Sequence, residues 1–155
     1  MEKQNFYDLN FDHLKNFLTS KVEIDSTKAK MRAQQMFNAV YKKNIKSFDE
    51  LTTFSLELRE KIKKLISLEK PKIVDIQKSK DGTIKFLLEL KDKRNVETVL
   101  IPDKSQSRYT ICLSVSVGCY LSCEFCATAQ ISKNLVRNLT PGEIISQIIL
   151  SKDYI

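Results

Sequence analysis

The spacing of apolar residues changes at Pro71, and this change divides the chain into a helical part and a strand-rich part. Before Pro71, apolar residues recur three or four positions apart, as they do in segment 29–40, which is typical of amphipathic helices. After it, apolar and polar residues alternate over short runs, and Asp81–Gly82 is a strong hairpin turn signal. The sequence therefore predicts an α+β fold, with a helical domain over residues 1–67 and an antiparallel β segment over residues 70–102.

Polar residues that favour helix starts recur through the first part of the chain. Asn10, Ser26, Ser47 and Ser55 each stand just before an apolar periodic run. A side-chain oxygen at such a position accepts a hydrogen bond from a backbone N–H that the helix itself leaves unpaired. Ser47 is also followed three residues later by Glu50, which completes a capping box. We therefore expect a helix to begin after each of these four residues.

The β segment is expected to contain three antiparallel strands, over residues 73–78, 83–90 and 96–101. Basic residues gather near its turns, and they are the best candidates in the chain for contacts with phosphate groups. These residues are Lys78, Lys80, Lys85, Lys91, Lys93 and Arg94. Charge alone favours a simpler interpretation, a lysine-rich surface that is only solvated.

The last third of the chain predicts a strand, a loop and a helix. Tyr109–Val115 has strand-like alternation, and Thr140-Pro-Gly-Glu143 combines an N-cap, a first-turn proline and a capping glutamate. We expect the helix that follows to pack through one isoleucine face, which consists of Ile144, Ile145, Ile148 and Ile149. Residues 103–155 therefore form a third predicted region.

Three cysteines lie on the loop between that strand and that helix. Cys119, Cys123 and Cys126 have the spacing C-x3-C-x2-C, which suits three corners of a [4Fe–4S] cluster and leaves one iron without a protein ligand. Phe125 stands where its ring could shield such a cluster from water. The alternative is a closed zinc site in which Cys112 provides a fourth thiolate.

Four stretches around these cysteines carry a wider resemblance. They are Asp81–Lys85, Val96–Pro102, Cys112–Cys119 and Arg137–Ile145. Together with the cysteine spacing, they make the sequence similar to the RlmN/Cfr-type radical S-adenosylmethionine RNA adenosine methyltransferases, in the same order and at nearly the same spacing. The resemblance extends from about Phe6 to the end of the chain.

The resemblance implies a function and a role for each candidate residue. Family members use S-adenosylmethionine and a [4Fe–4S] cluster to methylate C2 of adenine in 23S rRNA and tRNA through a methyl-cysteine intermediate. Glu97 matches the residue proposed to accept a proton from the adenine adduct, and Cys112 matches the cysteine that resolves the enzyme–RNA adduct by disulfide formation. Taken without the resemblance, Glu97 is an edge-strand surface residue and Cys112 is a buried core thiol.

The resemblance also implies that most of a barrel is absent. Residues 103–155 would be the first β/α unit of a truncated radical S-adenosylmethionine partial barrel, without the family's glycine-rich motif and its second catalytic cysteine. We therefore expect the chain to be the N-terminal portion of such an enzyme, completed by a C-terminal half and reduced by an electron donor such as flavodoxin. A non-catalytic fragment that binds RNA or a cluster is the alternative.

Charge and composition bear on the partners and the compartment. Residues 1–102 hold 21 Lys and Arg against 15 Asp and Glu, whereas residues 103–155 hold 5 against 4. The basic excess thus precedes the cysteine loop, which suits an accessory surface that contacts RNA. Four cysteines without a secretory signal predict a reducing cytoplasm, and no apolar run approaches the ~20 residues of a membrane span.

Overall fold

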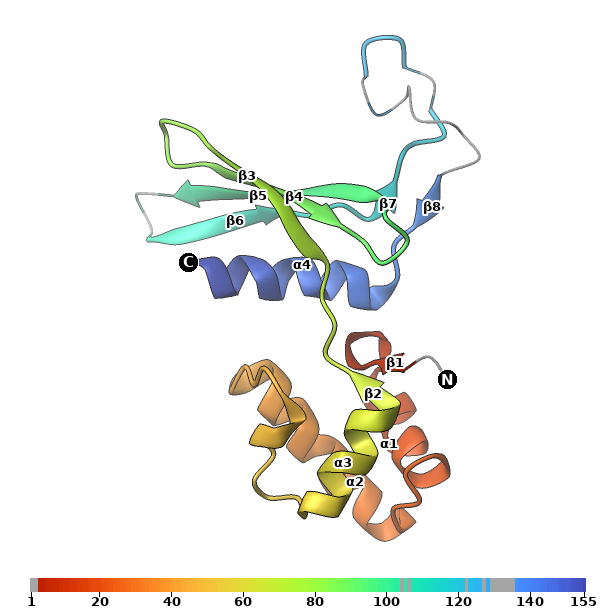
Figure 1. Ribbon diagram of the computed structural model, residues 1–155. Coiled ribbons are helices and arrows are strands. Elements are labelled where there is room, and N and C mark those ends of the chain that lie inside the picture. Colours follow the sequence, from red (N-terminus) through yellow and green to blue (C-terminus); the bar gives the residue numbers. More distant parts are fainter. Residues whose placement is uncertain (1–2, 104, 106, 122, 127, 129–135) are drawn as a thin grey trace. The chain divides into compact units, whose positions relative to one another are not determined.

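The change of apolar spacing near Pro71 coincides with a division of the structure into two separately packed units. The structure is a computed structural model that describes residues 3–103, 105, 107–121, 123–126, 128 and 136–155. Unit 1 comprises Met1–Glu69 and unit 2 comprises Lys70–Ile155 (Figure 1). Among the described residues, no helix is both long and apolar enough to cross a membrane.

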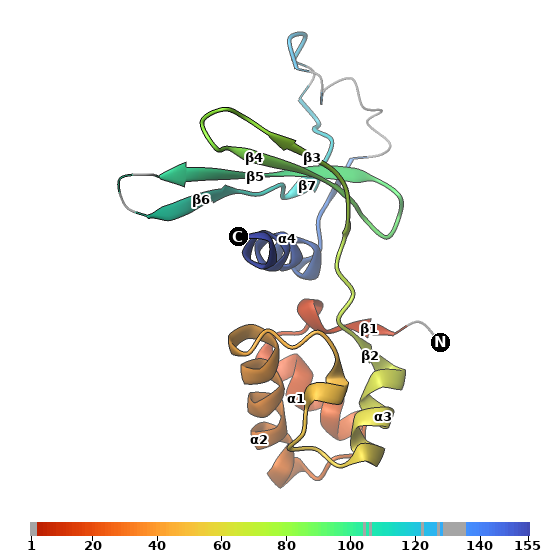
Figure 2. The same ribbon diagram turned by 60° about the vertical axis from the view of Figure 1, so that its left-hand side comes forward.

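Unit 1 is a small helical domain, as its caps predict. Its helices are α1 (Phe11–Ser20), α2 (Ser26–Phe37) and α3 (Leu56–Leu65), with short 3-10 turns at η1 (Phe6–Asp8) and η3 (Phe48–Glu50) and a π-helical turn at η2 (Asn38–Lys42). Figure 2 shows the three α-helices side by side within this unit. Two short strands, β1 (Gln4–Asn5) and β2 (Ile66–Ser67), pair in parallel and join the two ends of the unit.

The predicted helix starts are correct with one shift. The Asn10 side chain accepts from the His13 N–H at 2.8 Å, Ser55 caps α3, and Ser47 forms the expected capping box with Glu50. The second helix, however, is capped by Asp25 rather than by Ser26, because the Asp25 carboxylate accepts from the Thr27 N–H at 2.9 Å. The negative charge of a carboxylate at this position is also stabilised by the positive end of the helix dipole.

The core of unit 1 is a layer of aliphatic residues beside a group of aromatic rings. Leu14, Leu18, Met36 and Ile62 are fully buried between the helices. Phe6 is also fully buried, and it contacts a set of neighbouring rings. These rings are Tyr7, Phe37, Tyr41 and Phe48. Burial of each large apolar side chain contributes about 1.5–3 kcal/mol, so the core accounts for the helical packing.

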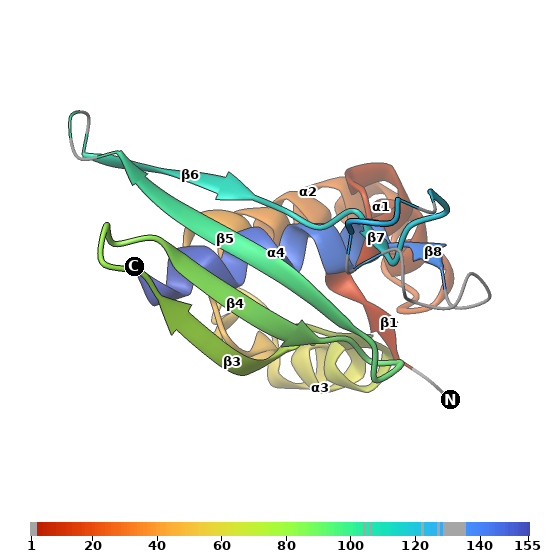
Figure 3. The ribbon, with the colours of Figure 1, turned by 90° about the horizontal axis from the view of Figure 1, so that it is seen from above.

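Unit 2 is built on a four-stranded antiparallel sheet. Its strands are β3 (Lys72–Lys78), β4 (Ile84–Glu89), β5 (Asn95–Asp103) and β6 (Arg108–Cys112), in the order β3-β4-β5-β6. Helix α4 (Pro141–Tyr154) runs across one face of this sheet (Figures 1 and 3). Two further short strands, β7 (Ser116–Val117) and β8 (Arg137–Asn138), pair antiparallel with each other.

The sheet corrects the strand prediction for this region. Three antiparallel strands and a separate strand over 109–115 were expected, but β6 is the fourth strand of the same sheet and ends at Cys112. The reason is the length of β5. Strand β5 continues beyond Leu100, which pairs with Ile84 of β4. Its last residues pair with β6 alone, as far as the pair Asp103↔Arg108. The strands on either side of the expected boundary at residues 102 and 103 therefore belong to one sheet.

The predicted hairpin turn at Asp81–Gly82 is correct. Gly82 has a φ of 95°, a conformation that side-chain-bearing residues rarely adopt, and its N–H donates to the Ser79 carbonyl at 3.1 Å. A Cβ atom at this position would lie 3.2 Å from the Pro102 ring, so both the backbone conformation and the close approach of Pro102 favour glycine here.

Alternation along the strands directs apolar residues toward α4. Phe86, Leu88, Val96 and Leu100 are buried on this face and form the core of unit 2. The helix contributes a set of partly buried side chains that pack against this core: Ile144, Leu150 and Tyr154.

The isoleucine face expected for α4 is therefore only partly correct. Ile144 packs on the core, but Ile148 is 42% exposed. Residues three, four and seven positions apart share a helix face, and the stripe that faces the sheet passes through Ile144, Gln147 and Tyr154.

Candidate functional site

The cysteine loop leaves the sheet through a short paired stem. Strand β7 ends at Val117, and Gly118, with a φ of 66°, turns the chain toward Cys119. The chain returns in β8, where Ser116 pairs with Asn138 and Val117 pairs with Arg137. The Leu139 N–H adds a bond to the Val115 carbonyl at 2.9 Å. Both ends of the loop are thus fixed to the same part of unit 2.

The three loop cysteines are partly accessible, and none of the four described cysteines forms a disulfide. The Leu121 N–H lies 3.4 Å from the Cys119 sulfur, and the Cys126 N–H donates to the Cys123 carbonyl at 3.1 Å. The donor set suits a cluster, because three thiols on one short loop provide three ligands. No group of three Cys, His, Asp or Glu among the described residues is gathered closely enough to hold a metal ion. Binding therefore requires the sulfurs to move toward one another.

Phe125 and its neighbours on the loop are strongly exposed. The Phe125 side chain is 94% exposed, and Tyr120 and Leu121 are each 68% exposed. In this conformation the Phe125 ring does not cover the cysteines, so its predicted shielding role also depends on a change of the loop. Exposed apolar side chains of this kind add little to the stability of unit 2.

Glu97 and Cys112 lie together on the face of the sheet opposite α4. Both side chains are exposed, while their neighbours Val96 and Ile111 point toward the core. Cys112 is in register with Val99, two residues after Glu97, which makes Glu97 and Cys112 diagonal neighbours on adjacent strands. Diagonal neighbours in a sheet lie about 7–8 Å apart. The alternative interpretation of Cys112 as a buried core thiol is wrong.

The Glu97 carboxylate has a basic partner on the next strand. Lys85 Nζ lies 3.0 Å from Glu97 Oε1, and both side chains are substantially accessible to water. The interpretation of Glu97 as a surface residue is therefore correct, but its strand, β5, lies between β4 and β6 and is not an edge strand. Its position beside Cys112 is what distinguishes it from other surface carboxylates.

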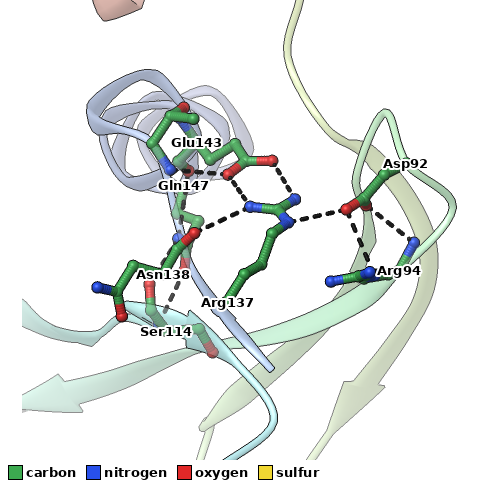
Figure 4. Close-up of polar contacts among 8 residues, drawn as sticks. Asp92, Arg94, Ser114, Arg137, Asn138, Glu143 and Gln147 are labelled. Carbon is green, nitrogen blue, oxygen red and sulfur yellow. Dashed lines mark hydrogen bonds and ion pairs between the residues drawn. The ribbon is translucent and has the colours of Figure 1, made fainter. Parts of the chain in front are cut away.

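Gln147 joins α4 to the segment that leads from Cys112 into the loop (Figure 4). Its buried side chain accepts from Thr98 Oγ1 at 2.7 Å and from the Ser114 N–H at 3.0 Å. It also donates to the carbonyls of Ser114 and Glu143, at 2.9 and 3.2 Å. All four hydrogen-bonding positions of the amide are used, so these bonds offset the cost of removing the group from water.

Arg137 occupies the other end of the loop and links three elements (Figure 4). Its guanidinium makes two bonds of 2.8 Å to the Glu143 carboxylate, on the first turn of α4. It makes a third bond of 2.8 Å to Asp92, in the turn between β4 and β5, and a fourth to the Asn138 carbonyl at 3.1 Å. Bidentate pairs of this kind are stronger and more directional than single contacts.

The charges of this network shift one another's pKa. Hydrogen bonds from Arg137 hold the pKa of Asp92 below its ordinary value. Burial acts to raise the pKa of Glu143, but its bonds from Arg137 and from the Thr140 N–H outweigh burial and lower it. The pKa of Arg137 rises because of Glu143 first and Asp92 second. All three groups are therefore charged over the physiological range.

Sequence reasoning found one half of this network. The capping box of Thr140 and Glu143 was expected and is present, with the Thr140 N–H bonded to Glu143 at 2.8 Å. The roles of Arg137, Asp92 and Gln147 were missed. In the sequence, Arg137 is marked only by its position six residues before the capping Glu143. Nothing near Arg137 indicates its second partner, Asp92, which lies in the distant turn between β4 and β5.

The basic residues near the turns are mostly engaged within unit 2. Lys85 pairs with Glu97, Lys93 pairs with Glu89 at 2.9 Å, and Lys78 lies over the Tyr154 ring at 5.3 Å. Accessible ion pairs are worth little, so Lys85 and Lys93 can exchange their carboxylate partners for phosphates at small cost.

Known proteins resemble the chain over almost its full length. Residues 4–68 match the model of the ribosomal RNA large subunit methyltransferase N-terminal domain. The dual-specificity RNA methyltransferase RlmN of Campylobacter fetus subsp. fetus is 41% identical over 160 residues, covering 96% of this chain and 42% of that protein. The resemblance to the RlmN-type family is confirmed. The RlmN of Oleidesulfovibrio alaskensis is 40% identical, covering 95% of this chain and 39% of that protein.

A solved structure extends the RlmN-type resemblance to the fold. A radical SAM methyltransferase from Sphaerobacter thermophilus aligns with a TM-score of 0.81 and 31% identity, covering 97% of this chain and 42% of that one. The aligned part of the chain therefore includes both unit 1 and unit 2. The chain spans about two-fifths of the length of these relatives.

Proposed function

We propose that this chain provides the cluster-binding and accessory regions of a radical S-adenosylmethionine RNA methyltransferase. Its reaction is methylation of C2 of adenine in 23S rRNA and tRNA through a methyl-cysteine intermediate. One observation carries the proposal. Glu97 and Cys112 share an open face of the sheet, and the loop with three cysteines begins seven residues after Cys112. The RlmN-type relatives and the similar radical SAM methyltransferase support it.

In this proposal the loop cysteines hold the cluster. Cys119, Cys123 and Cys126 would ligate three irons of a [4Fe–4S] cluster, and Phe125 would lie against it once the loop closes. When bound, the cluster supplies an electron to S-adenosylmethionine, whose cleavage yields the radical that the chemistry needs. An electron donor such as flavodoxin restores the cluster, in a cytoplasmic setting.

The open face of the sheet would receive the RNA base. Glu97 would accept the proton that leaves the adenine adduct, and Lys85, whose Nζ lies 3.0 Å from Glu97 Oε1, would hold the carboxylate in place. The exposed thiol of Cys112 would attack the sulfur of the methyl-carrying cysteine, which belongs to the C-terminal half of such enzymes, and would release its proton. As the S–S bond forms, the bond between that sulfur and the transferred carbon would break, and its electron pair would stay with the carbon, which takes up a proton to become the methyl group. Basic side chains near the turns would contact the RNA phosphates.

The metal content of matched cysteine variants tests the proposal. The chain is reconstituted anaerobically with iron and sulfide, and iron, sulfide and zinc are counted per chain. We expect four irons and four sulfides in the native chain and in Cys112→Ser, and loss of the cluster in Cys123→Ser. Zinc that binds without sulfide and is lost in both variants would instead establish the four-thiolate zinc site.

A further inference from the structure

The two ends of the cysteine loop are fixed by two different sets of side-chain hydrogen bonds. Gln147 holds the incoming end through Ser114, and Arg137 holds the returning end within β8. Both sets connect to α4, because Gln147 and Glu143 lie one turn apart on that helix. The helix thus fixes the distance between the chain entering the loop and the chain leaving it.

The described part of the loop has little apolar packing. Tyr120, Leu121 and Phe125, its large apolar side chains among the described residues, are mainly exposed. The three sulfurs must also come together before they can share a cluster. Fixing the ends of a chain segment lowers the entropy that is lost when its middle becomes ordered.

The geometry at Arg137 is specific to a guanidinium. Two parallel bonds to Glu143 and one to Asp92 use separate nitrogen atoms in one plane. A lysine ammonium carries the same charge but cannot reproduce this planar fork. The arrangement therefore fixes direction as well as charge.

We propose that Arg137 is a positioning residue for cluster binding, which acts through Glu143 and Asp92 to hold the returning end of the cysteine loop. The inference rests on the proposed function, because it concerns the cluster that the three cysteines would hold. Arg137 itself touches neither the cluster nor the substrate in this account.

A second ion pair in unit 2 provides a matched control. Lys70 Nζ lies 2.8 Å from Asp153 Oδ2, at the opposite end of α4 from Glu143, and both side chains are partly buried. Loss of this pair removes a contact of equal length from the same helix. It leaves the stem of the cysteine loop untouched.

The test compares Arg137→Gln, Arg137→Lys and Lys70→Gln with the native chain after anaerobic reconstitution. The first readout is the rate at which a chelator removes iron from the cluster. We expect iron loss to be on the order of tenfold faster in Arg137→Gln, the lower end of what loss of a supporting partner costs a metal site. Arg137→Lys should fall between Arg137→Gln and the native chain, and Lys70→Gln should match the native chain.

The second readout needs no metal. Hydrogen exchange at the Val117 and Leu139 amides reports opening of the loop stem, and it should accelerate in Arg137→Gln but not in Lys70→Gln. Equal iron loss and equal stem exchange in Arg137→Gln and Lys70→Gln would overturn the inference. A native chain that takes up no cluster would instead refute the proposed function, and stem exchange alone would then decide whether Arg137 positions the loop.

Discussion

The sheet-and-helix frame of unit 2 and the cysteine loop that it carries differ in where their apolar side chains lie. In the frame, Phe86 and Leu100 are almost completely buried beneath α4. In the loop, Tyr120 and Phe125 are mostly exposed. The frame is therefore stabilised by its own packing, whereas the described loop residues have little packing, and polar contacts of Ser114 and Arg137 join the two ends of the loop to α4. A region with little packing of its own can rearrange around a ligand, and a rigid frame can hold it in place.

The largest expected effect separates the two regions by truncation of one leucine in each. Leu100→Ala removes a fully buried side chain and should destabilise unit 2 by about 2–5 kcal/mol. Leu121→Ala removes a side chain that is mostly exposed and should change stability by less than about 0.5 kcal/mol. Native-state hydrogen exchange of the β4 and β5 amides measures both values. Equal losses would show that the loop is part of the core.

The next effect concerns the buried amide that joins the two regions. Gln147→Met keeps the length of the side chain but leaves Thr98 Oγ1 and the Ser114 backbone without their partner. We expect a loss of about 1–3 kcal/mol, measured by urea unfolding. The exposed Gln77→Met is the control and should be close to neutral. A neutral Gln147→Met would mean that the junction adds nothing to stability.

A smaller, pH-dependent effect is expected at the returning end of the loop. The pKa values of Asp92 and Glu143 are lowered in the fold from ordinary values of 3.8 and 4.5. Their contribution is therefore fully present above pH 4.5 and is lost as the pH falls through the lowered values. The stability gap between the native chain and Arg137→Gln should be wide at pH 7 and should narrow below pH 4. Thermal unfolding across this range checks it, and a gap that widens in acid would contradict the assignment.

The smallest effect is expected at an accessible ion pair of the frame. Lys93→Gln breaks the pair with Glu89, in which the lysine side chain is 79% exposed. We expect a change below about 0.5 kcal/mol in urea unfolding, since exposed pairs contribute little. A larger loss would mean that the turn between β4 and β5 is held by charge rather than by its backbone hydrogen bonds, which join Lys93 to Leu90 and Leu90 to Arg94.

Local signals predicted much of the fold. The helix caps at Asn10, Ser47 and Ser55 and the turn at Gly82 each depend on residues within four positions, so sequence was sufficient. Strand β6 was assigned to a different element because its pairing depends on the length of β5, which no local pattern specifies.

The same distinction holds for the candidate site. The cysteine spacing and the capping box around Glu143 are local and were recognised from sequence. The link from Arg137 to Asp92 spans 45 positions and required the structure. So did the placement of Glu97 beside Cys112, because their separation is set by strand register and not by sequence distance.

The measurement that tests the account most directly is an EPR spectrum of the reconstituted, reduced chain with and without S-adenosylmethionine. An open iron on a cluster held by Cys119, Cys123 and Cys126 predicts a [4Fe–4S] signal that shifts when the cofactor is added. A native chain that takes up iron and sulfide but whose signal ignores the cofactor, or one that forms no cluster, would contradict the central claim that this loop leaves an iron open for chemistry.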